Sequence, residues 1–220
     1  MSASARSRSL PSVTLLAAAL SLLALVALAG CTTIEDLATR PTMTPILPSG
    51  TRLDPPSDLP EITLTGFAGE PVSLSDFQGK PTLVYFGYTY CPDVCPLTLA
   101  DFARVARLLG DHIEDVAFVF ISVDPARDTP ERLAAYIPAF DEHFIGLTPS
   151  DDEAALQTAT QAFGVYYEYE TVENTAAGYL VAHTSSSFLL DPTGRLAVVY
   201  GYQMPPEVIA ADMGQMLTEE

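Results

Sequence analysis

The chain has 220 residues, a length that allows one or at most two domains. Its residues are 48% hydrophobic and 17% charged, a composition typical of a globular protein with a core. Its formal net charge is -18, from 28 acidic and 10 basic residues. Such an acidic chain is repelled by DNA, RNA and anionic lipid surfaces, which argues against a nucleic-acid function. Composition does not locate the charge, so either solubility or an acidic face for a basic partner explains it.

The first thirty residues differ from the rest of the chain. Two arginines precede an almost wholly apolar run over residues 13–29, which is the pattern of an export signal. The run ends in Leu-Ala-Gly-Cys at residues 28–31; this resembles a bacterial lipobox, in which the cysteine is lipidated and becomes the new N-terminus. An uncleaved transmembrane anchor is the alternative, because the run almost reaches the ~18–20 residues that span a bilayer. We interpret residues 1–30 as a lipoprotein signal peptide and Cys31 as the lipid attachment site of a cell-membrane protein that faces the periplasm or extracytoplasmic side.

Residues 31–60 begin with this cysteine and continue as a proline-rich segment. Six prolines and little apolar periodicity mark the segment, which is typical of an extended linker. We interpret it as a tether that holds a folded domain off the membrane. The domain itself is expected over residues 61–220.

Strands and helices alternate along the expected domain. Runs of β-branched and aromatic residues predict buried strands, and apolar residues near helical spacing predict the helices between them. The expected strands cover residues 62–64, 72–74, 82–88, 116–123, 187–190 and 196–200, and the expected helices cover residues 97–109, 129 onward, 151–163 and 206–217. This order predicts an α/β protein with a thioredoxin-like fold, in which helices flank a central mixed β-sheet, with an N-terminal extension and an insert.

Cys91 and Cys95 lie in the segment Tyr-Cys-Pro-Asp-Val-Cys-Pro, residues 90–96, where a buried strand gives way to a helix. Thiols four residues apart at a helix start project to the same side, and the helix N-terminus favours thiolate over thiol. If Cys31 carries lipid, these are the two remaining cysteines of an exported chain. They can bind a soft metal ion or form a redox disulfide, and the alternatives are a static disulfide or two inert buried thiols.

Three ordered motifs resemble the Sco/SenC family, the assembly factors for cytochrome c oxidase. Residues 86–96 (Phe-Gly-Tyr-Thr-Tyr-Cys-Pro-Asp-Val-Cys-Pro) are similar to the family's copper-site loop. Residues 122–130 (Ser-Val-Asp-Pro-Ala-Arg-Asp-Thr-Pro) and residues 183–194, which begin with His-Thr, are similar to its second and third signatures. Two departures are visible: Tyr90 replaces a frequent histidine, and Ala182 replaces a frequent aspartate.

The resemblance implies that His183 is a metal ligand together with Cys91 and Cys95. The residues alone do not single it out, since a lone histidine is more often structural and His112 and His143 are also present. Two thiolates and an imidazole form a soft site that suits Cu(I), Zn or, through the imidazole, Cu(II). The imidazole must be neutral to bind, so we expect the affinity for copper to fall in acid.

Asp124 and Asp128 have two interpretations each. Asp128 or Thr129 can cap the helix that begins near Pro130, with Glu131 as the partner in a capping box. Asp124 ends a buried strand, where its carboxylate can face the thiol loop. The resemblance implies that both aspartates support the metal site without being firm ligands.

The family resemblance implies a metallochaperone that delivers copper to the CuA site of cytochrome c oxidase subunit II. The alternative is a thiol–disulfide reductase that keeps the CuA-site cysteines reduced, so whether the chain is an enzyme stays open. Further partners on either interpretation are other periplasmic copper chaperones or thiol reductants. Against a general oxidoreductase, three residues separate the cysteines where thioredoxin has two, and His183-Thr184 stands where thioredoxin has its proline. A peroxidase would need a peroxidatic motif, which the sequence does not contain. A copper sensor or store would need a signalling partner, which the sequence does not indicate.

Overall fold

The computed structural model describes residues 49–150, 152–171 and 178–218. Its main feature is a six-stranded mixed sheet in the order β1-β10-β9-β4-β5-β6. The strands are β1 (Thr51–Ser57), β4 (Thr82–Gly87), β5 (Ala117–Ser122), β6 (Phe144–Leu147), β9 (Ser187–Leu190) and β10 (Leu196–Tyr200). The predicted central mixed sheet is therefore confirmed.

The centre of the sheet is the parallel pair β4 and β5, in register from Thr82 opposite Ala117 to Gly87 opposite Ser122. Every residue of both strands is buried, which is why both read as continuous apolar runs without alternation. β6 extends the parallel part, whereas β9 runs antiparallel to β4. Because β4 and β5 are parallel, their carboxyl ends lie at the same end of the sheet, and the residues after Gly87 and Ser122 meet there.

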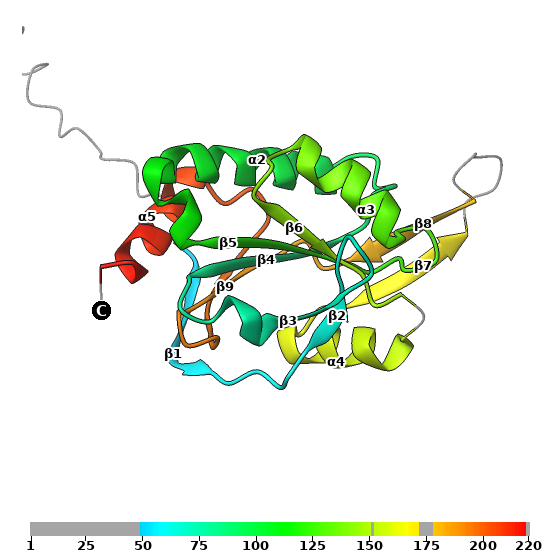
Figure 1. Cartoon of the computed structure of the whole chain (residues 1–220), viewed down its shortest axis with the longest axis horizontal. Coiled ribbons are helices and arrows are strands. Elements are labelled where there is room, and N and C mark those ends of the chain that lie inside the picture. The colour runs from blue at the N-terminus through cyan, green and yellow to red at the C-terminus, as the bar shows by residue number, and fades with distance from the viewer. Residues whose placement is uncertain (1–48, 151, 172–177, 219–220) are drawn as a thin grey trace, which may run out of the picture. The chain divides into compact units, whose positions relative to one another are not determined.

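Helices cover both faces of the sheet. α2 (Val94–Leu109) and α3 (Pro130–Tyr136) lie on one face, and α4 (Glu153–Phe163) lies on the other (Figure 1). α5 (Pro206–Met216) lies beside α2. The thioredoxin-like α/β arrangement predicted from the order of elements is confirmed.

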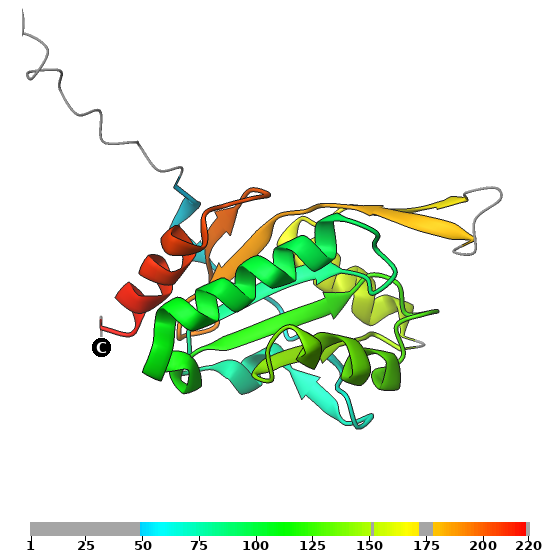
Figure 2. The same ribbon diagram turned by 90° about the horizontal axis from the view of Figure 1, so that it is seen from above.

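Short elements complete the described part of the domain. They are the β2–β3 hairpin (Thr63–Thr65 and Pro71–Ser73) and the 3-10 helices η3 (Leu74–Phe77), η4 (Gly110–Asp115) and η5 (Ile137–Ala139). A second hairpin, β7 (Tyr167–Thr171) with β8 (Tyr179–His183), is inserted between α4 and β9. It extends beyond the end of the six-stranded sheet in both views (Figures 1 and 2). An insert was expected from the sequence, but neither its place nor its strands were predicted.

One boundary differs from the expectation. Residues 51–57 were assigned to the tether, but they form β1 and pair with β10 at the edge of the sheet. β1 contains Pro55 and Pro56, and most of its residues are exposed, so it has no alternating apolar pattern. Proline is tolerated in an edge strand because one side of that strand needs no hydrogen-bond partner. The folded unit therefore begins before residue 60.

The expected signal peptide, Cys31 and most of the tether lie outside the described residues. Within the described ranges, no helix is long and apolar enough to cross a membrane.

Candidate metal centre

The predicted ligands Cys91, Cys95 and His183 come together at the end of the sheet where the central strand β4 ends. Cys91 lies in the turn after β4, Cys95 in the first turn of α2, and His183 is the last residue of β8. Their candidate ligand atoms all lie within 4.8 Å of one another. Cys95 and His183 are 88 residues apart in the sequence, and the fold brings them into contact.

The imidazole of His183 is oriented by its backbone surroundings. Nε2 lies 3.3 Å from the Sγ atom of Cys95, and Nδ1 lies 2.9 Å from the carbonyl oxygen of Thr184. When Nδ1 carries the proton and donates it to this carbonyl, the Nε2 lone pair faces the thiols and can bind a metal ion. The rings of Tyr85 and Tyr88 contact the imidazole edge-on, with centroid distances of 6.1 Å and 5.9 Å.

The two thiols have different acidities because they share hydrogen bonds. The pKa of Cys91 is lowered to about 4, chiefly by a hydrogen bond from the Cys95 thiol and also by His183 and backbone N–H groups, although burial acts in the opposite direction. The backbone N–H of Cys95 donates to the Cys91 sulfur over 3.4 Å. The hydrogen bond to Cys91 and burial raise the pKa of Cys95. The pair therefore titrates in two separate steps, and these hydrogen bonds favour the thiolate on Cys91.

Tyr85 and Gly87 of β4 pack against the side chain of Cys95. Sequence reasoning did not single out either residue. The Tyr85 hydroxyl donates to the Cys95 sulfur over 3.6 Å, and burial raises the pKa of Tyr85, so it remains a neutral donor. A Cβ atom at Gly87 would lie 3.0 Å from the Cys95 sulfur and 2.9 Å from the Phe120 ring. Residues two apart in a strand point to the same face of the sheet. This spacing was the available signal in the sequence that Tyr85 and Gly87 lie together.

Asp128 is fully buried and bonds to the loop before Cys91. Its carboxylate accepts from the backbone N–H of Thr89 (3.0 Å), the Thr89 hydroxyl (2.6 Å) and the Ser122 hydroxyl (2.7 Å). Burial raises the pKa of Asp128, although these hydrogen bonds oppose the shift. The helix-cap interpretation is wrong for Asp128, because Thr129 is the cap of α3 and accepts from the backbone N–H of Arg132.

Asp124 is also fully buried and contacts the inserted hairpin. Its carboxylate accepts from the Nε atom of Arg127 and from the Tyr179 hydroxyl at 2.7 Å. Among the described residues, neither Asp124 nor Asp128 belongs to the group of ligand atoms. Sequence reasoning gave Arg127 no role of its own, and its place in residues 122–130 was the only signal for it.

The other two histidines lie outside the ligand group of the described residues. His143 Nδ1 contacts Asp141 at 2.7 Å, and this hydrogen bond raises the pKa of His143. His112 contacts Asp115 at 3.3 Å. Both are paired with carboxylates near the surface, which accounts for them without a metal.

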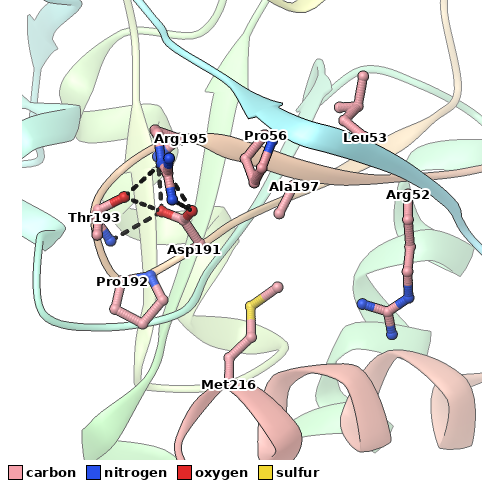
Figure 3. A pocket seen from close by; sticks show the side chains of 9 residues that line it. All are labelled: Arg52, Leu53, Pro56, Asp191, Pro192, Thr193, Arg195, Ala197 and Met216. Carbon is pink, nitrogen blue, oxygen red and sulfur yellow. Dashed lines mark hydrogen bonds and ion pairs between the residues drawn. The ribbon is translucent and has the colours of Figure 1, made fainter. Parts of the chain in front are cut away.

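A separate cavity of about 420 Å³ lies between β1, the β9–β10 turn and α5 (Figure 3). Its charged groups are engaged with neighbouring side chains: Asp191 binds Thr193 and Arg195, and Arg52 binds Asp212. None of the three candidate ligands lines it. The cavity therefore has no part in the chemistry of the Cys–Cys–His group.

Two sulfur atoms and one imidazole nitrogen are the donors that soft metal ions prefer. The fold and this group of atoms define a thioredoxin-like protein with a Cys–Cys–His metal-binding group. The family model described as SCO1/SenC matches residues 55–218. The chain belongs to the SCO1/SenC family.

Relatives and solved structures agree with this assignment. Protein sco1 of Schizosaccharomyces pombe is 34% identical over 148 residues, which are 66% of this chain and 56% of that protein. The solution structure of apo Sco1 from Thermus thermophilus is 38% identical, with a TM-score of 0.68, and covers 79% of this chain and 99% of that chain. The structure of Bradyrhizobium japonicum ScoI with copper bound is 35% identical, with a TM-score of 0.66, and covers 73% of this chain and 100% of that chain.

Proposed function

We propose that this chain binds copper through Cys91, Cys95 and His183 and delivers it to the CuA site of cytochrome c oxidase subunit II during assembly of the oxidase. The observation that carries the proposal is the convergence of the three ligand atoms within 4.8 Å. Membership of the SCO1/SenC family and the copper bound to the Bradyrhizobium japonicum relative support it. Copper is the cargo of this reaction.

The site is suited to ligand exchange. Cys91 is a thiolate at neutral pH and is only half-buried, whereas Cys95 is inaccessible. Three protein ligands leave a coordination position through which a cysteine of the partner can enter. Exchange then starts at Cys91, the accessible ligand, while Cys95 and His183 still hold the ion. Loading releases the proton of Cys95, so acid disfavours the copper-bound form.

A thiol–disulfide reductase is the second candidate, and the lowered pKa of Cys91 favours it. The Cys91 thiolate attacks a partner disulfide, forms a mixed disulfide and releases one partner thiolate. Cys95 then gives up its proton and attacks the Cys91 sulfur, which releases the second partner thiolate and leaves a Cys91–Cys95 disulfide. Two electrons pass to the partner, and an extracytoplasmic dithiol reductant must restore the pair.

The membrane location and the further partners are also proposals. Lipid on Cys31 would hold the domain at the extracytoplasmic face of the cell membrane, close to a membrane-bound oxidase. Other periplasmic copper chaperones are the proposed source of copper, and thiol reductants the proposed source of electrons.

Copper titration of the reduced chain from Thr32 onward, against a competing Cu(I) chelator, tests the function. We expect one tightly bound copper per chain, and we expect Cys91→Ser to abolish tight Cu(I) binding. His183→Ala should weaken Cu(II) binding more than Cu(I) binding, since imidazole suits Cu(II). His143→Ala is the matched control and should bind as the unsubstituted chain does. If the unsubstituted chain binds no copper but its thiols stay reactive, the reductase becomes the better proposal.

A further inference from the structure

The β7–β8 hairpin carries His183 but lies outside the six-stranded sheet. Its strands pair with each other, with Tyr167 opposite His183. Val181 is the only buried residue of these two strands, so the hairpin adds little to the hydrophobic core. Contacts between hairpin side chains and the rest of the domain therefore help to position His183.

Arg127, in the loop between β5 and α3, makes such contacts. Its Nη1 atom donates to the Tyr179 carbonyl oxygen over 3.0 Å, and its Nε atom donates to Asp124. Its guanidinium carbon lies 3.6 Å from the ring centroid of Tyr179 and 4.8 Å from that of Tyr90. A planar guanidinium can stack on aromatic rings and donate hydrogen bonds at the same time. One side chain thus contacts both the first residue of β8 and the residue before Cys91.

Two hydroxyl groups of the hairpin complete this attachment. The Tyr179 hydroxyl donates to the buried Asp124 carboxylate over 2.7 Å, on the same side chain that pairs with Arg127. The Tyr169 hydroxyl donates to the carbonyl oxygen of Val123 over 3.1 Å. The residues after β5 therefore hold the hairpin at both of its strands.

We propose that Arg127 is a positioning residue for His183. It stacks between the hairpin that carries the imidazole and the loop that carries Cys91, and so sets the distance between the two halves of the Cys–Cys–His group. The effect of Arg127 on copper affinity rests on the proposed function, whereas its effect on the position of the hairpin does not. Asp124 acts in the same unit, because it fixes the guanidinium and the Tyr179 ring together.

Hydrogen exchange of the full chain in detergent, without copper, tests the attachment. In Arg127→Ala we expect backbone amides of residues 167–171 and 179–183 to exchange at least tenfold faster, while those of β4 and β5 keep their rates. Arg127→Lys should also exchange faster, since it retains the charge but not the planar contacts. Arg107→Ala removes an exposed arginine of α2 and is the matched control, with no change expected. Unchanged hairpin exchange in a folded Arg127→Ala variant overturns the proposal.

Copper affinities test the consequence for His183. We expect Arg127→Ala to lower Cu(II) affinity by about 10-fold or more, as outer contacts of a ligand do, and to lower Cu(I) affinity less. In a His183→Ala background the same substitution should have no further effect, because its action passes through the imidazole. An equal loss of Cu(II) affinity in both backgrounds overturns the positioning role.

A milder variant keeps the test valid if Arg127→Ala unfolds. Tyr179→Phe retains the stacked ring and loses only the hydroxyl that binds Asp124, and it should raise hairpin exchange by a smaller factor. Exchange at the rate of the unsubstituted chain counts against the attachment. Absence of copper binding by the unsubstituted chain contradicts the proposed function alone, and hydrogen exchange still decides whether Arg127 holds the hairpin.

Discussion

Cys91 and Cys95 differ in their surroundings although only three residues separate them. Cys91 lies in a turn, is half-buried and accepts hydrogen bonds at its sulfur, whereas Cys95 is inside the domain above Tyr85 and Gly87. The same hydrogen bond that lowers the pKa of Cys91 raises the pKa of Cys95. On the proposed function, the accessible, ionised sulfur would exchange with a partner and the inner sulfur would retain the ion.

Alkylation by iodoacetamide measures this difference. An ordinary thiol with a pKa near 9.0 reacts about tenfold faster for each unit of pH between 6 and 8, because the thiolate is the nucleophile. With its pKa lowered to about 4, Cys91 is already ionised over this range. We therefore expect its alkylation rate, followed by peptide mass spectrometry on the reduced apo chain, to change less than about twofold.

Cys95→Ala is the informative control for this experiment. It removes the thiol whose hydrogen bond contributes most to the low pKa of Cys91. The pKa of Cys91 should then rise toward its ordinary value, and alkylation should regain its dependence on pH. A steep pH dependence in the unsubstituted chain would contradict the assignment of the thiolate to Cys91.

At the scale of elements, β1 covers the edge of the main sheet. It pairs with β10, whose Val198 and Tyr200 are fully buried. The backbone at Gly50 comes so close to them that an added Cβ atom would lie 2.4 Å from a Val198 methyl group. β1 thus belongs to the folded domain, although most of its own side chains face solvent.

A chain that begins at Asp58 should be less stable than one that begins at Ser49. Loss of β1 exposes apolar surface of Val198 and Tyr200, and exposing a large apolar side chain costs about 1.5–3 kcal/mol. We expect the free energy of unfolding, measured by urea denaturation, to fall by about 2–4 kcal/mol. Arg52→Ala in the longer chain removes only the ion pair with Asp212, and with a largely exposed arginine it should cost less than about 1 kcal/mol. Equal stability of the two chains would restore the tether interpretation of residues 51–57.

At the scale of the whole molecule, the chain combines an acidic composition with a proposed lipid anchor. Cleavage before Cys31 would remove two of the ten basic residues and none of the 28 acidic ones, so the formal charge of the cleaved chain would be 8 - 28 = -20. A chain with this charge is repelled by anionic lipid surfaces. Attachment to the membrane would therefore depend on the covalent lipid.

Lipid attachment is tested by expressing the full chain in a bacterium supplied with a labelled fatty acid. We expect the label and the membrane fractionation of the chain to disappear in Cys31→Ala, because the lipidated sulfur is absent. Cys91→Ala should retain both and is the matched cysteine control. Label or signal cleavage that persists in Cys31→Ala would contradict the lipoprotein interpretation. Membrane fractionation of the unsubstituted chain with neither label nor cleavage would favour an uncleaved transmembrane anchor.

The thioredoxin-like fold, the buried strands β4 and β5, and the motifs that carry the candidate ligands were predictable from the sequence. β4 and β5 are apolar throughout, and the two cysteines stand at a strand-to-helix junction, so local patterns carry this information. β1 was missed because an exposed edge strand with two prolines has no such pattern. β7 and β8 were missed because Val181 is the only buried residue of these two strands.

The sequence by itself determined the fold class, the cysteine pair and, through the family's motifs, the identity of the histidine. Tertiary structure alone decided that Asp128 fixes the loop before Cys91, that Thr129 caps α3, and that Arg127 and Asp124 hold the hairpin of His183. The physical reason is that helices and buried strands follow from contacts close in sequence. Buried polar networks, by contrast, join residues from separate elements, so their partners are set only when the elements pack together.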